Sequence, residues 1–185
     1  MALLLKHLHN FLNRRDLPWV SLIWDTYYHY SVPQGTDSCG SFWWKDIYKL
    51  MDHYRNTTWV QVNCGSSALF WSDKWKIGES VEPLQIRFPR LFSYVKDPWI
   101  TVYEAFQSQD MVNMFHLPLS AQAYQEFLTV QNLMVSCSRD LEVKDSWFWQ
   151  GTCNAFKPKL FYSLMHSNMS FNPLLLWIWR SSCTM

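Results

Sequence analysis

The stretch that decides the fold is Thr57 to Trp75, TTWVQVNCGSSALFWSDKW. It holds two short runs rich in Val, Thr, Phe and Trp, which flank Asn63, Cys64 and Gly65. Glycine is the residue that best tolerates the left-handed backbone of a short hairpin loop. The pattern therefore predicts a central β-hairpin over about 58–72.

The second run of this stretch ends in an F-W-x-D-x-W spacing, formed by Phe70, Trp71, Asp73 and Trp75. A buried Trp needs an acceptor for its indole N–H, and an Asp two residues away can accept that bond or form a turn. Tryptophans in such a setting belong to protein cores far more often than to reactive sites. We interpret the motif as a structural signature without catalytic chemistry.

This hairpin and its F-W-x-D-x-W motif resemble a segment downstream of the polymerase domain in plant non-LTR (LINE-type) retrotransposon proteins. Other stretches, in the same order, resemble that family's linker between reverse transcriptase and zinc-binding region: Ala2–His9, Pro18–Val20, Gly40–Asp46 and Phe88–Phe92. Two more resemble the opening of the zinc-binding region, DSWFW with Trp147 and Trp149, and WIWRSSC with Trp177 and Trp179. One departure is Asn63-Cys64 before Gly65, where the family has Gly-acidic-Gly or Asn-Gly.

The resemblance implies two parts, a connector-like region over 1–138 and the start of a reverse-transcriptase zinc-binding-like region over 139–185. It also implies that the family's polymerase and its zinc ligands lie outside this chain, as in a copy truncated at both ends. The expected function is that of a non-catalytic remnant of a LINE-type retrotransposon polyprotein with no independent activity. Nucleic acid is the implied partner of the full-length ancestor.

The residues themselves indicate no enzyme, no cofactor, no metal site and no small-molecule substrate. The sequence has no Asp-Asp pair of the kind that holds two metal ions, no Gly-rich phosphate loop and no nucleophile elbow. Cys153, His166 and Cys183 lack the paired spacing of a closed zinc site. On a helix, His7 and His9 point about 200° apart, so two solvated histidines are favoured over a shared metal.

Composition leaves a second interpretation open. The net charge is +1, and 18% of the residues are aromatic, including 12 Trp. This charge gives no general attraction to nucleic acid or membranes, whereas so many rings are hard to bury in a chain of 185 residues. The alternative function is a retained RNA- or protein-binding module that uses an aromatic surface. A clustered positive face favours that module, an apolar uncharged face favours the remnant, and exposed aromatics predict self-association.

Cysteine usage and the N-terminal segment bear on localisation. Five cysteines without a C-x-x-C pair show no extracellular disulfide pattern, and no signal peptide is evident. The apolar opening Leu3–Leu5 is too short to span a bilayer. We expect an intracellular protein, in the cytoplasm or nucleus, that is not secreted and has no membrane role.

Periodicity and capping residues predict an α+β chain that is mostly helical. Helices are expected over 2–13, 17–29, 41–54, 101–107, 120–136, 157–166 and 174–180. Three prolines leave only short elements over 76–100. Alternation around Val143 and Trp147, followed by Gly151, predicts a second short strand pair over about 143–156.

Overall fold

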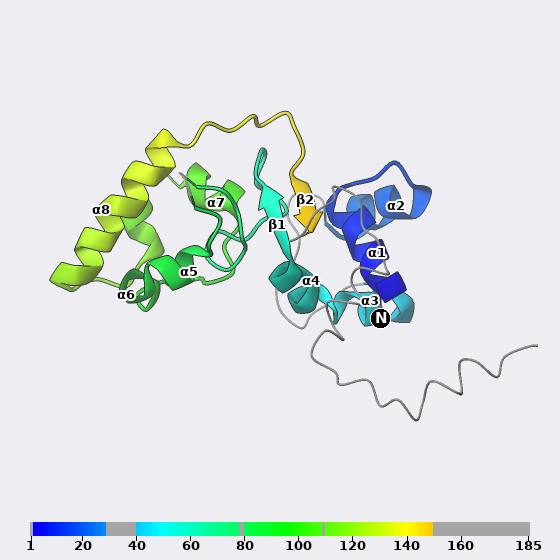
Figure 1. Ribbon diagram of the computed structural model, residues 1–185, viewed down its shortest axis with the longest axis horizontal. Helices are drawn as coiled ribbons and strands as arrows, with labels where there is room; N and C mark the ends of the chain where they lie inside the picture. The colour runs from blue at the N-terminus through cyan, green and yellow to red at the C-terminus, as the bar shows by residue number, and fades with distance from the viewer. Residues whose placement is uncertain (1, 29–39, 78–79, 109, 150–185) are drawn as a thin grey trace, which may run out of the picture. The chain divides into compact units, whose positions relative to one another are not determined.

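The computed structural model describes residues 2–28, 40–77, 80–108 and 110–149, with the backbone alone for 2 and 3. Within these ranges the predicted α+β class is confirmed, because helices predominate and one two-stranded antiparallel sheet is present (Figure 1). The helices are α1 Ala2–Leu12, α2 Pro18–Tyr27, α3 Phe42–Tyr48, α4 Met51–Thr57, α5 Leu84–Arg87, α6 Pro89–Phe92, α7 Val102–Gln107 and α8 Ala121–Ser136, with a 3₁₀ turn η1 at Met111–Met114. The strands are β1 Thr58–Gln61 and β2 Ser146–Trp149.

Local signals placed several helix starts correctly. Pro18 occupies the first turn of α2, where its missing N–H costs nothing. Thr101 and Glu104 form the reciprocal capping box that begins α7. Ser120 accepts a hydrogen bond from the N–H of Ala123 and begins α8.

The helix predicted over 41–54 is instead two helices, α3 and α4. The N–H of Leu50 donates to the carbonyl of Ile47 at 3.0 Å, three residues back, whereas an α-helix pairs residues four apart. The chain is thereby redirected before α4 begins, and Met51 and Tyr54 both become buried. Apolar periodicity alone did not reveal this break, since both helices carry apolar residues on several sides.

The hairpin predicted over 58–72 is wrong, although its first run is a strand. β1 pairs antiparallel with β2, so that Thr58 lies opposite Trp149 and Trp59 opposite Phe148. The rings of Trp59 and Phe148 stack at 4.7 Å between centroids, a cross-strand contact that stabilises the pairing. Figure 1 shows the two strands side by side, with α4 leading directly into β1.

The second run meets β1 at its end, where the N–H of Val60 donates to the carbonyl of Lys74 at 2.8 Å in a parallel bridge, not the antiparallel pairing of a hairpin. Its earlier residues make their backbone hydrogen bonds with the segment that leads into α7. The N–H of Phe70 donates to the carbonyl of Ile100 at 2.9 Å, and that of Val102 donates to the carbonyl of Ala68 at 2.8 Å. β-forming residues favour any pleated, half-buried surface and do not specify which strand they pair with. A turn at Gly65 was therefore predicted correctly, but the partner of the following run was not.

The second predicted strand pair, 143–156, is also corrected. Its first half contains β2, which pairs with β1 rather than with a run near 153–156. Residues 150–185, including that run and the helices predicted over 157–166 and 174–180, lie outside the described residues. The division at 138/139 stays a prediction, and the sheet joins residues from both sides of it.

Buried aromatic side chains form much of the core. Phe11 of α1 stacks on Trp24 of α2 at 4.8 Å and contacts Trp44 of α3 at 4.5 Å. The indoles of Trp24 and Trp44 both find an acceptor, because Trp24 donates to the Phe11 carbonyl and Trp44 to the Tyr28 hydroxyl. These contacts bring α1, α2 and α3 together.

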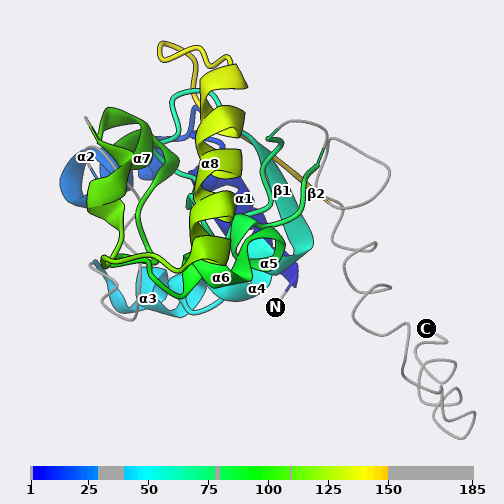
Figure 2. The same cartoon turned by 90° about the vertical axis from the view of Figure 1, so that its left-hand side faces the viewer.

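A second group of packed elements surrounds α8, which lies beside α6 (Figure 2). The buried stripe of α8 is Ala123, Phe127 and Val130, whereas Tyr124 and Val135 are exposed. This stripe follows the 4-3 spacing of one helix face. Among the described residues, no helix is both long and apolar enough to cross a membrane.

Candidate functional site

The F-W-x-D-x-W motif lies almost wholly inside the protein. Phe70, Trp71, Asp73 and Trp75 are each at most 1% exposed. The indole of Trp75 donates to the Phe70 carbonyl at 3.0 Å, so Asp73 is not its acceptor. Asp73 instead accepts the N–H of Leu69 at 2.6 Å, which closes the turn within the motif.

Asp73 also forms a buried ion pair with Arg55 of α4, which is 7% exposed. Burial raises the pKa of Asp73, while the Arg55 guanidinium and the N–H of Leu69 oppose that rise and the charge of Asp145 adds to it. The guanidinium also lies 5.3 Å from the ring centroid of Trp147. Arg55 thus links α4, the motif and β2.

Asp145 is the second buried carboxylate, 4% exposed, directly before β2. Its Oδ1 accepts the N–H groups of Asn63 and Gly65, both at 2.8 Å. Its Oδ2 accepts the N–H of Ser67 at 3.0 Å and the hydroxyl of Ser67 at 2.9 Å. The loop 63–67 therefore wraps the carboxylate with four donors, and we call this arrangement the Asp145 clamp.

Of the other aromatic signature residues, the structure describes Trp147 and Trp149. Trp147 is buried beside the Asp145 clamp, since its indole donates to the Ser67 hydroxyl at 3.0 Å. The ring of Trp149 meets that of Tyr54 edge-on at 5.6 Å. Trp177 and Trp179 lie outside the described residues.

The prediction that both N-terminal histidines are solvated is wrong for His9. Its Nδ1 lies 2.9 Å from the Tyr54 hydroxyl, and the side chain is 4% exposed. Burial, followed by the charge of Arg15, lowers the pKa of His9 to about 4. His7 lies edge-on to Trp19 and Trp43, and burial followed by Lys6 lowers its pKa as well.

In the ranges that the structure covers, no group of three or more His, Cys, Asp or Glu residues is placed to hold a metal ion. Cys153, His166 and Cys183 lie outside those ranges.

A pocket of about 380 Å³ adjoins the Arg55–Asp73 ion pair. Trp99, which is 48% exposed, stands in its wall with Asp52 and Gln85. Its charged residues are Asp52, Asp73 and Arg55, so acidic groups outnumber basic ones.

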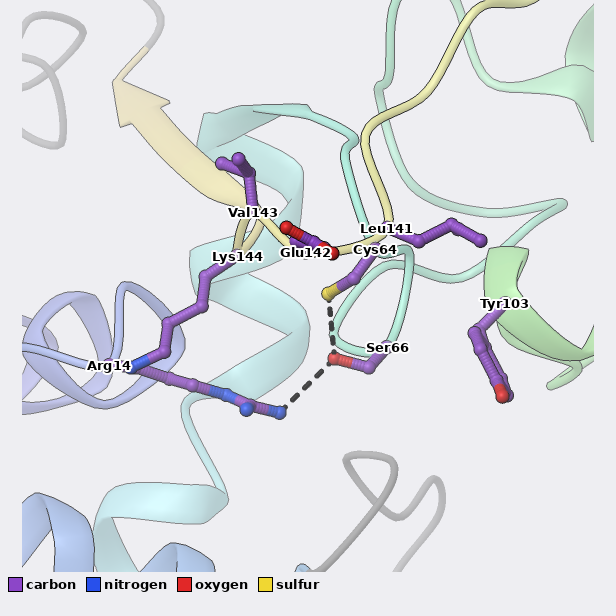
Figure 3. Close-up of a pocket in the computed structure, with 8 residues that line it drawn as sticks. All are labelled: Arg14, Cys64, Ser66, Tyr103, Leu141, Glu142, Val143 and Lys144. Carbon is purple, nitrogen blue, oxygen red and sulfur yellow. Dashed lines mark hydrogen bonds between the residues drawn. The ribbon is translucent and has the colours of Figure 1, made fainter.

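A second pocket, of about 300 Å³, has the opposite balance of charge (Figure 3). It is lined by Arg14, Cys64, Ser66, Tyr103 and the segment 141–144, and we call it the Arg14 pocket. The Arg14 guanidinium donates to the Ser66 hydroxyl at 3.1 Å, and the Cys64 sulfur lies 3.2 Å from the same oxygen. Cys64 and Ser66 belong to the loop that holds Asp145, so the clamp also fixes one wall of this pocket.

Arg14 enters the pocket from an unusual backbone position. Its φ is 44°, in the left-handed region, just after the end of α1. The N–H of Arg15 donates to the Asn10 carbonyl and that of Arg14 to the Phe11 carbonyl, the pattern of a helix end that usually takes glycine. The guanidinium carbon lies 3.9 Å from the ring centroid of Trp24, which holds the side chain in place.

Sequence reasoning missed the Arg14 pocket. Arg14 and Ser66 are 52 residues apart, and neither belongs to a motif with known chemistry. In the sequence, Arg14 is one of several basic residues that alternate with acids. Its placement at the end of a helix in a left-handed conformation becomes visible only in the folded chain.

Comparison with protein-family models, with curated proteins and with solved structures finds no match for this chain.

Proposed function

We propose that this chain is a non-catalytic structural module related to the connector and zinc-binding-like region of plant LINE-type retrotransposon proteins. The observation that supports it is the contact between its two motif regions. The Ser67 hydroxyl, just before F-W-x-D-x-W, donates to Asp145 and accepts the indole N–H of Trp147. The residues that carry the resemblance are thus the ones that interlock in the core.

The state of the two buried carboxylates supports a structural role. Asp145 accepts four hydrogen bonds from its own chain, and Asp73 is paired with Arg55. Both oxygens of Asp145, and Oδ2 of Asp73, are committed to protein donors, which makes them poorly suited to bind a metal ion or to transfer a proton. We therefore propose that the chain is no enzyme and turns over no small-molecule substrate.

Primer extension and nuclease assays with Mg²⁺ or Mn²⁺ test this proposal. The purified chain is expected to show no activity above that of an Asp73→Asn variant prepared in the same way. Activity that copurifies with the wild-type chain, and is lost in a folded Asp73→Asn or Asp145→Asn variant, would contradict it.

Metal analysis is expected to find no stoichiometric zinc. One tightly held zinc per chain would contradict this expectation and would point to Cys153, His166 and Cys183.

Localisation forms part of the same proposal. The structure describes Cys64 and Cys137 as free thiols, in keeping with a reducing compartment. We expect the protein in the cytoplasm or nucleus, with nucleic acid as a partner of the full-length ancestor and no association with membranes. Fractionation of cells that express the tagged chain tests this, and recovery from the secreted fraction would count against it.

A second candidate function is binding through exposed aromatic side chains, favoured by one feature of α3. Its first residues, Phe42 and Trp43, are 83% and 38% exposed. Adjacent exposed rings are unusual unless a partner covers them. The candidate partners are RNA, another protein or a second copy of this chain.

Two measurements separate these partners. Sedimentation at micromolar concentration is expected to show self-association that decreases in a Phe42→Ser/Trp43→Ser variant, and a Trp177→Ser/Trp179→Ser variant tests the sequence-based expectation for those residues. Fluorescence anisotropy with single-stranded RNA is expected to show only weak binding. A monodisperse wild-type monomer would contradict self-association, and tight salt-dependent RNA binding would favour the RNA-binding module instead of the remnant.

A further inference from the structure

The Arg14 pocket carries an inference that does not depend on the proposed origin of the chain. Its charged lining residues are Arg14, Lys144 and Glu142, so that basic groups outnumber acidic ones. Ion pairs in the described parts of the chain join Lys49 to Asp46 and Arg55 to Asp73, and neither includes Arg14 or Lys144. Two cations and one acid that form no ion pair leave the pocket with a net positive charge, which favours an anionic ligand.

The guanidinium of Arg14 is held in place before any ligand arrives. It stacks over the Trp24 ring at 3.9 Å and donates to the Ser66 hydroxyl at 3.1 Å. An Arg side chain has five N–H donors in a planar fork, and the bond to Ser66 uses one of them. The remaining donors can engage two oxygens of a phosphate, whose geometry this fork matches.

The backbone of Arg14 supports the same interpretation. A non-glycine residue with a φ of 44° is uncommon, and glycine would occupy this helix end without strain. Strained positions of this kind occur preferentially at binding sites. Here the left-handed position is occupied by an arginine whose side chain lines a pocket.

The other lining residues indicate what the phosphate is attached to. In Figure 3, Arg14 and Lys144 stand on one side of the pocket, with Tyr103 and Leu141 on the other. Tyr103 is 40% exposed and Leu141 56% exposed. An exposed aromatic ring beside an aliphatic side chain suits a flat, partly apolar ring system that can stack. A volume of about 300 Å³ lies at the lower end for a small-ligand site, which restricts the occupant to one compact unit.

We propose that the Arg14 pocket binds a nucleoside phosphate, with its phosphate held by Arg14 and Lys144 and its base against Tyr103. The Ser66 hydroxyl accepts from Arg14, and its own hydrogen can be donated to a phosphate oxygen while the Cys64 thiol turns toward the same hydroxyl. The same chemistry is offered by a free mononucleotide and by one unit of a single strand. The test therefore includes both ligands.

Isothermal titration calorimetry or NMR titration of the whole chain is the test, with adenosine 5′-monophosphate (AMP), adenosine, inorganic phosphate and a single-stranded oligonucleotide of about eight units. AMP is expected to bind with a Kd below about 1 mM and at least about tenfold more tightly than adenosine. Arg14→Gly keeps the left-handed helix end and is expected to weaken AMP binding about tenfold or more. Lys144→Ala, on an exposed segment that does not form the core, is expected to weaken it about threefold.

Arg15→Gly is the matched control, because it removes the same charge from the next residue, which does not line the pocket. It is expected to change AMP binding less than about twofold. If the oligonucleotide binds more tightly than AMP, and Arg14→Gly weakens its binding as much as it weakens AMP binding, the ligand is a unit of a single strand. If the oligonucleotide binds equally or more weakly, the ligand is the free nucleotide. The proposal is overturned if AMP fails to bind at about 10 mM, if adenosine binds equally well, or if Arg14→Gly and Arg15→Gly have equal effects.

Discussion

Gly65 and Asp145 lie 80 residues apart in the sequence, and the N–H of Gly65 donates a 2.8 Å hydrogen bond to Oδ1 of Asp145. This contact is the centre of the Asp145 clamp. It connects the loop after β1 to the residue directly before β2. The clamp lies directly before β2, and Cys64 and Ser66 of its loop form one wall of the Arg14 pocket.

The first prediction concerns the backbone of Gly65. Its φ is +79°, and a Cβ there would lie 2.8 Å from the backbone nitrogen of Tyr103. Gly65→Ala is therefore expected to lower the free energy of unfolding by about 2–4 kcal/mol, from left-handed strain plus a clash that a side-chain rotation cannot relieve. Urea denaturation measures it.

Gly40→Ala is the matched comparison for this experiment. Gly40 also has a positive φ, +106°, but a Cβ there would first meet the Trp44 side chain, at 3.1 Å. The expected loss is about 1–2 kcal/mol. An equal loss in both variants would show that the approach to the Tyr103 backbone does not matter.

The second prediction concerns the Asp145 carboxylate. Asp145→Ala leaves four donors without their acceptor in a buried site, and a loss of about 3–5 kcal/mol in unfolding free energy is expected. Asp145→Asn keeps one acceptor oxygen and is expected to lose roughly half as much. Chemical denaturation of the two variants measures this order, and an Asn variant as stable as the wild type would rule out the clamp as a major source of stability.

The third prediction concerns the Arg55–Asp73 ion pair. Removing one partner leaves a buried charge uncompensated, so Arg55→Met and Asp73→Leu are each expected to lose about 3–5 kcal/mol. The double variant removes both charges and is expected to lose clearly less than the sum. A double-mutant cycle by urea denaturation gives the coupling free energy; additive losses would mean that the two side chains do not interact energetically.

The fourth prediction concerns pH and His9. Its pKa is lowered from 6.5 to about 4 in the folded chain, so the unfolded chain binds a proton first as the pH falls. The stabilisation is therefore fully present above about pH 6.5 and is lost between about 6.5 and 4, by about 3 kcal/mol in total. His9→Gln, which can still bond to Tyr54, is expected to remove this loss in melts recorded across that range.

His116 provides the control for the pH experiment, because it is exposed. His116→Gln is expected to retain the wild-type dependence of stability on pH. A His9→Gln chain that loses as much stability as the wild type between these pH values would show that His9 does not cause the effect.

Sequence patterns were informative wherever the controlling interactions are local. The capping box at Thr101 and Glu104 and the cap at Ser120 depend on residues within one helical turn, so they could be read directly. The turn at Gly65 was found for the same reason, since only a residue without Cβ suits its φ. The mostly helical α+β class followed from such signals taken together.

The sequence by itself determined where several helices begin, where the chain turns at Gly65 and that the F-W-x-D-x-W motif is core material. Only the tertiary structure decided that β1 pairs with β2, that Asp145 is held by the loop 63–67, and that Arg14 meets Ser66. The physical reason is that the strand propensity and the charge of a residue indicate which interactions it can make. They do not indicate which distant residue will contact it. That choice depends on packing the aromatic core and on satisfying buried carboxylates, and both involve residues far apart along the chain.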